Sequence, residues 1–181
     1  MNRNLLPLVA LSCLVASCEQ VTPNDYFGRA VLNLNMFHGF AGTRMESELK
    51  QPSMKLADVG GKEVVQMTRK EVVDGKIQFA EDAYEKVKKL RETDDAREIL
   101  NASKAVYEYI LPVYRNEYQE LAKLYDSKAS QSEIDALSQT IRGKYGEGFQ
   151  TRMDAVVAAG KPYAERHGLK VQWDVGTSPA P

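Results

Sequence analysis

The chain has 181 residues, 43% hydrophobic and 27% charged, with 24 Lys and Arg against 25 Asp and Glu. This composition is typical of a folded globular domain and excludes a disordered chain or a multi-span membrane protein. A net charge of −1 lacks the basic excess that nucleic-acid binding requires, so we expect no nucleic-acid partner. Two Cys and two His are too few for a Cys/His zinc site, and we expect no cofactor.

The first 18 residues carry a targeting pattern. Arg3 precedes the apolar run Leu5–Leu14, which is too short to span a membrane and is followed by small residues, as in a secretory signal peptide. The segment Val15-Ala16-Ser17-Cys18 resembles the lipobox of bacterial lipoproteins. That resemblance implies cleavage after residue 17 and acylation of Cys18 with fatty acids such as palmitate. The alternative is a plain cleaved signal peptide.

The lipobox resemblance also implies a location in the cell envelope. The membrane partner would be reached through the lipid on Cys18, and Glu19, rather than Asp, follows this cysteine. We therefore expect the periplasmic face of the outer membrane in a diderm host. Residues 18–24 would form a tether in which Glu19–Asn24 extends at most about 20 Å, so the domain would lie close to the bilayer.

Hydrophobic residues recur at steps of three and four in four segments, which predicts helices. The segments are about 24–49, 61–92, 95–126 and 131–167, and the connections between them are short. Short connections favour antiparallel neighbours. We therefore expect an all-α fold, an antiparallel up-down four-helix bundle over residues 25–168, and a loosely ordered tail over 169–181.

Two of the expected helices contain helix-breaking residues. Pro112 should bend the third helix, because proline removes a backbone donor. The fourth helix contains three glycines in its interior, Gly143, Gly146 and Gly148, and each of them destabilises a helix. Whether this helix is continuous or broken there stays open. The start of the fourth helix is better marked, because Ser130 and Glu133 form a capping-box pattern.

Four polar residues fall on the apolar stripes of these helices: His38, Arg69, Glu117 and Arg152. At a rise of about 1.5 Å per residue, Arg69 and Glu117 reach one height and His38 and Arg152 another. Arg69 and Glu117 are therefore expected to form a partly buried ion pair. His38 and Arg152 are either a core histidine and an arginine that reaches solvent, or a site for the anionic group of a ligand.

Two further sets of residues are candidate contact surfaces. Four tyrosines lie near one line of the third helix, where they either seal the core boundary or form an aromatic groove for a glycan or peptide: Tyr107, Tyr114, Tyr118 and Tyr125. A second apolar stripe on the first helix contains Leu32, Met36 and Phe40. Either the loop 50–60 covers this stripe, or it is a partner interface or ligand pocket.

The chain lacks the common catalytic patterns, including Gly-x-Ser-x-Gly, His-Glu-x-x-His and the P-loop. We therefore expect a protein that is not an enzyme. The leading hypothesis is a lipid-anchored envelope protein whose helical bundle binds a partner protein or an apolar or anionic ligand. The alternative is an immunity- or inhibitor-type lipoprotein that blocks a toxin or enzyme at the envelope. A third class, a hydrolase with a carboxylate pair, has no positive support in the sequence.

Overall fold

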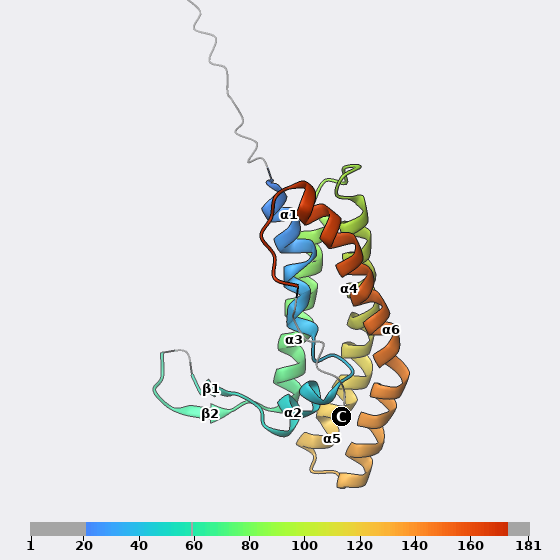
Figure 1. The fold of residues 1–181 in the computed structure, drawn as a ribbon. Coiled ribbons are helices and arrows are strands. Elements are labelled where there is room, and N and C mark those ends of the chain that lie inside the picture. The colour runs from blue at the N-terminus through green and yellow to red at the C-terminus, as the bar shows by residue number, and fades with distance from the viewer. Residues whose placement is uncertain (1–20, 59, 174–181) are drawn as a thin grey trace, which may run out of the picture.

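The computed structural model describes residues 21–58 and 60–173. The predicted signal peptide, the lipobox and Cys18 lie outside this part of the chain. The described part is an antiparallel helical bundle in which the chain runs down, up, down and up again (Figure 1). The predicted all-α class is therefore confirmed. The elements are α1 (Pro23–Ala30), η1 (Leu32–Phe37), α2 (Thr43–Lys50), β1 (Met54–Leu56), β2 (Val64–Gln66), α3 (Arg69–Lys88), α4 (Arg97–Val113), η2 (Tyr114–Tyr118), α5 (Gln119–Asp126) and α6 (Gln131–Arg166).

The first layer of the bundle is not the single helix predicted over 24–49. α1 begins at an N-cap, Thr22, and is followed by the 3₁₀ turn η1 and the separate helix α2. The chain turns between η1 and α2, where Ala41 has a φ of 49° in the left-handed region. The backbone N–H of Ala41 donates to the hydroxyl of Tyr118 over 2.8 Å, which holds this turn against the core. A tertiary contact thus interrupts a segment whose periodicity alone favours a helix.

The second predicted helix, over 61–92, is correct only from residue 69 onward. α3 spans Arg69–Lys88, and the residues before it form the antiparallel hairpin of β1 and β2. Gly60 lies in the connection between the strands with a φ of 84°. Thr68 and Glu71 form a capping box that begins the helix at residue 69. The prediction of a helix from residue 61 is therefore wrong.

The third predicted helix continues through Pro112, but it changes its winding. α4 contains Pro112, the π-helical turn η2 follows, and α5 carries the chain to Asp126. The side-chain amide of Asn116 donates to the carbonyl oxygen of Pro112 over 2.8 Å. The wider π turn places both Tyr114 and Tyr118 in the core, where their rings lie 5.1 Å apart.

The fourth helix, α6, runs without a break through its glycines, so the open question about Gly143–Gly148 is settled in favour of one helix of 36 residues. The predicted capping box of Ser130 and Glu133 is present at its start. At Gly148 a Cβ atom would clash with the hydroxyl of Tyr109 on α4. Glycine at this position therefore lets α4 and α6 approach closely.

The predicted loosely ordered tail is in part packed. Leu169, Val171 and Trp173 are partly buried against the bundle. The Trp173 ring meets the ring of Phe27 edge-on at 5.7 Å and covers Gly160 of α6. The expectation is thus wrong for residues 169–173, because three apolar side chains find space beside α1 and α6. Residues 174–181 lie outside the described residues.

Candidate functional site

The hairpin of β1 and β2 projects from the side of the bundle (Figure 1). Its register pairs Met54 with Gln66, Lys55 with Val65, and Leu56 with Val64. Since side chains alternate between the two faces of a strand, Met54, Leu56 and Val64 share one face. These side chains are 58%, 54% and 54% exposed. The hairpin therefore carries an uncovered apolar face, which is typical of a contact surface.

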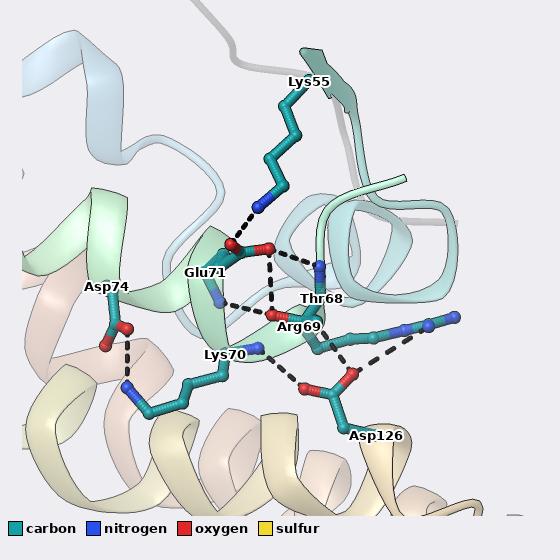
Figure 2. Close-up of polar contacts among 7 residues, drawn as sticks. All are labelled: Lys55, Thr68, Arg69, Lys70, Glu71, Asp74 and Asp126. Carbon is teal, nitrogen blue, oxygen red and sulfur yellow. Dashed lines mark hydrogen bonds and ion pairs between the residues drawn. The ribbon is translucent and has the colours of Figure 1, made fainter. Parts of the chain in front are cut away.

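A polar cluster fixes the hairpin to the start of α3 (Figure 2). The carboxylate of Glu71 accepts a hydrogen bond from the backbone N–H of Thr68 over 2.9 Å, and its other oxygen forms an ion pair with Lys55 of β1. The hydrogen bond from Lys55, followed by the one from the Thr68 backbone, lowers the pKa of Glu71. One carboxylate thus begins the helix and connects it to the strand.

Asp126, the last residue of α5, caps α3 from outside (Figure 2). Its two carboxylate oxygens accept hydrogen bonds from the backbone N–H groups of Arg69 and Lys70, each over 3.0 Å. The first N–H groups of a helix have no partner within the helix, and a carboxylate there also offsets the positive end of the helix dipole. Asp126 therefore holds the base of the hairpin at the end of the bundle where α6 begins.

The expected ion pair between Arg69 and Glu117 is replaced by other contacts. The Arg69 guanidinium lies 4.0 Å from Asp126 and donates to the carbonyl oxygen of Leu49 over 3.1 Å. Glu117 accepts a hydrogen bond from the hydroxyl of Tyr145 on α6 and lies 3.8 Å from Lys144. The predicted pairing is thus wrong, because Arg69 is the first residue of its helix and Glu117 lies in the π turn.

A groove of about 590 Å³ lies between the first turn of α3 and the π turn. Its polar lining consists of Lys70, Arg115, Asn116, Gln119, Glu120, Lys123 and Asp126. Each of its cations has an acidic neighbour: Lys70 pairs with Asp74, Arg115 with Glu81 and Lys123 with Glu120. The hydrogen bond from Lys70 is the main cause that lowers the pKa of Asp74. Because its charges are already matched, the groove offers no excess of either sign to a charged ligand.

His38 and Arg152 have separate surroundings. The Nε2 atom of His38 lies 3.1 Å from the side-chain oxygen of Asn35, and burial, with a smaller effect of Arg44, lowers the pKa of its imidazole. Arg152 donates to the carbonyl oxygen of Gly148 over 2.7 Å and stacks 4.0 Å from the centre of the Tyr109 ring. The guanidinium thus packs on α4, while His38 lines a small apolar groove beside Val156 and Trp173.

The tyrosine row on α4, η2 and α5 is part of the core rather than an exposed aromatic face. Tyr107, Tyr114 and Tyr118 are at most 2% exposed, and burial raises the pKa of each phenol. Among the described residues, the hydroxyls of Tyr107 and Tyr125 have no hydrogen-bond partner. The hypothesis of a glycan or peptide groove along these four tyrosines is therefore wrong for the three buried rings.

The second apolar stripe of the N-terminal layer is partly exposed and partly buried. Leu32 and Met36 are 47% and 55% exposed, whereas Phe40 is buried and contacts the rings of Tyr114 and Phe149. The stripe is not continuous, because the helix on which it was predicted ends before η1. Leu32 and Met36 remain exposed apolar residues.

Sequence reasoning missed the hairpin residues Met54, Leu56 and Val64. A usable signal was present, since Gly60-Gly61 separates Met54–Leu56 from the β-branched pair Val64-Val65. The prediction instead places Met54 and Leu56 in the loop 50–60 and Val64 in a helix that begins at residue 61.

Comparisons with protein-family models, curated proteins and solved structures find no match to this chain. Within residues 21–58 and 60–173, no helix is long and apolar enough to cross a membrane. In the same part of the chain, no group of three or more His, Cys, Asp or Glu side chains is placed to hold a metal ion. The proposal below therefore rests on the geometry of the hairpin and of its attachment to the bundle.

Proposed function

We propose that this protein is a lipid-anchored, non-catalytic envelope protein that binds a partner protein through the outer face of its hairpin. The observation that carries the binding is the exposure of Met54, Leu56 and Val64 on one face of an element that projects from the bundle. Burial of exposed apolar surface is the main driving force for protein association.

The proposed anchor is the lipid on Cys18, which rests on the lipobox-like sequence. The described chain begins at Val21, beside α1, and three residue steps from Cys18 reach at most about 10 Å. α6 has 36 residues and is about 54 Å long, and the hairpin lies near the end where α6 starts. On this proposal, the bundle holds the hairpin away from the periplasmic face of the outer membrane.

The anchor is tested with the full-length chain in its host. The wild-type protein should take up labelled palmitate and fractionate with the outer membrane, whereas Cys18→Ala should do neither. Cys13→Ala is the matched control, because Cys13 lies in the apolar run and should not change the labelling. Undiminished labelling of Cys18→Ala would refute the anchor.

Partner binding is tested by placing a photo-crosslinking amino acid at position 56 in cells. We expect one discrete adduct, which should disappear when Met54→Lys and Val64→Lys are added. The same amino acid at position 154 on the exposed side of α6 is the control and should give no such adduct. An adduct that forms only after challenge with a toxin would favour the immunity-type alternative, and equal adducts at positions 56 and 154 would contradict hairpin binding.

A further inference from the structure

The register of the hairpin determines which backbone groups point outward. The N–H of Ala57 donates to the carbonyl of Glu63, and the N–H of Met67 donates to the carbonyl of Ser53, each over 2.9 Å. Hydrogen-bonded and non-hydrogen-bonded pairs alternate along an antiparallel ladder. The pairs formed by Met54 and by Leu56 are therefore non-hydrogen-bonded, and these two residues direct their N–H and C=O groups to the outer edge of β1.

This edge carries no backbone hydrogen bond to another element among the described residues. The same two residues also carry the exposed apolar side chains of β1. A free strand edge with apolar side chains is a template for a further strand, and charges, proline, a bulge or a short strand limit that pairing. With three residues, β1 can pair with only a short segment. Within β1 the one charged residue is Lys55, and its ammonium group is held by Glu71 on the opposite face of the strand.

Two occupants of this edge are disfavoured by the geometry. Two copies of the chain that paired edge to edge would meet along a strand of three residues, which buries far less than the about 800 Å² per partner of a stable dimer. The chain's own lipid would be attached to Cys18, which precedes α1, and α1 lies at the other end of the bundle. The open backbone groups instead match an extended polypeptide segment, because only such a segment offers N–H and C=O groups at strand spacing.

We propose that an extended segment of a partner protein adds to the edge of β1 as a third strand, pairing with the backbone of Met54 and Leu56. This inference rests on the proposed function and names the chemistry of its partner. Alternate side chains of the segment are apolar and lie beside Met54 and Leu56 on the same face of the sheet. The segment has no proline at the positions that pair with β1, because proline lacks the N–H that the carbonyl groups of β1 accept.

The experiment uses the full-length protein in lipid nanodiscs and a displayed library of random peptides of about six residues, the usual length of a strand. We expect selection to enrich peptides with alternating apolar residues. Binding of an enriched peptide should shift the amide signals of Met54 and Leu56 in NMR spectra. A matched peptide that is N-methylated at the amides facing β1 should bind at least about tenfold more weakly, since it keeps the side chains and loses the donors.

Two proline variants separate the two edges of the hairpin. Leu56→Pro removes an outward N–H from β1 and leaves the cross-strand hydrogen bonds in place, and it should weaken peptide binding at least about tenfold. Gln66→Pro makes the same change at the outer edge of β2 without removing an apolar side chain, and it should leave binding unchanged. Circular dichroism checks that both variants keep the bundle.

The proposal is overturned if no alternating peptide is enriched, if N-methylation has no effect, or if Gln66→Pro weakens binding as much as Leu56→Pro. Concentration-dependent shifts of Met54 and Leu56 without peptide would assign the edge to a second copy, and shifts with phosphatidylglycerol vesicles alone would assign it to lipid. If the cellular adduct at position 56 persists when Met54→Pro removes the other outward N–H of β1, partner binding stands and strand addition fails.

Discussion

The bundle and the hairpin use the same types of apolar side chain in opposite ways. In the bundle, Leu34, Phe37 and Tyr107 are completely buried. In the hairpin, Met54 and Leu56 are more than half exposed. The bundle is therefore held together by burial of apolar surface, whereas the hairpin gains little from it.

The hairpin is held instead by polar contacts at its base. Lys55 pairs with Glu71, and the side-chain amide of Gln66 donates to the carbonyl oxygen of Pro52 over 3.3 Å. A two-stranded hairpin without a core is marginal on its own. Stability and the proposed binding surface therefore lie in separate parts of the molecule, so each can be changed without the other.

The largest expected effect compares two leucines that differ in burial. Leu34→Ala creates a cavity in the core and should lower the free energy of unfolding by about 2–5 kcal/mol. Leu56→Ala removes the same atoms from an exposed face and should cost less than about 0.5 kcal/mol. Urea unfolding followed by circular dichroism measures both. Similar losses of stability in the two variants would contradict the conclusion that the bundle, and not the hairpin, supplies the stability.

The next effect compares two buried tyrosines within the bundle. Tyr118→Phe removes the acceptor of the buried Ala41 N–H and should cost about 1–3 kcal/mol. Tyr107→Phe removes a buried hydroxyl that has no partner among the described residues, so it should be neutral or stabilising. Thermal and urea unfolding test the pair. If Tyr107→Phe lowers the free energy of unfolding more than Tyr118→Phe does, the hydroxyl of Tyr107 does have a partner, such as a buried water.

A smaller effect tests how closely α4 and α6 pack. Gly143→Ala meets no neighbouring atom and should stabilise the protein by about 0.5–1 kcal/mol, because alanine favours a helix. Gly148→Ala places a methyl group against the Tyr109 hydroxyl, which donates to the carbonyl of Tyr145, and should destabilise by about 1 kcal/mol or more. Equal stability of the two variants would mean that the helices do not approach as described.

Much of the bundle could be predicted because local signals agreed with its packing. The start of α6 followed from Ser130 and Glu133, and its periodicity outweighed three glycines. The N-terminal layer could not be predicted in the same way. Its turn depends on Ala41 meeting Tyr118, which lies 77 positions further along the chain. Periodicity describes one segment at a time and carries no information about such a contact.

The candidate site was less predictable, because its residues were placed by helix boundaries. The predicted heights assumed a helix that starts near residue 61, which put Arg69 inside the bundle beside Glu117. Since α3 starts at Arg69, that residue lies level with Asp126 at the end of α5. The π turn moved Glu117 toward Tyr145 on α6. An error of eight residues in one boundary thus changed the partner of Arg69, and an unpredicted π turn changed that of Glu117.

The smallest expected effect is a local response to pH, which we expect in the hairpin and not in the bundle. Hydrogen bonds from Lys55 and Thr68 lower the pKa of Glu71, so the folded protein holds this carboxylate ionised more strongly than the unfolded chain does. The stabilisation is therefore present above the unfolded pKa of about 4.3 and is lost as the pH falls through the lower folded value. On protonation, Lys55 loses its partner and the hairpin loosens first.

Amide NMR spectra recorded from about pH 6 to about pH 3 measure this loss. Signals of Lys55 and Thr68 should shift together with a midpoint below about 4.3, while signals of the buried residues Leu34 and Tyr107 stay in place. Glu71→Gln is the matched control, because it keeps the shape of the side chain and cannot ionise. If the same transition persists in Glu71→Gln, another carboxylate controls the hairpin, and if Leu34 shifts with Lys55, the hairpin and the bundle respond to acid as one unit.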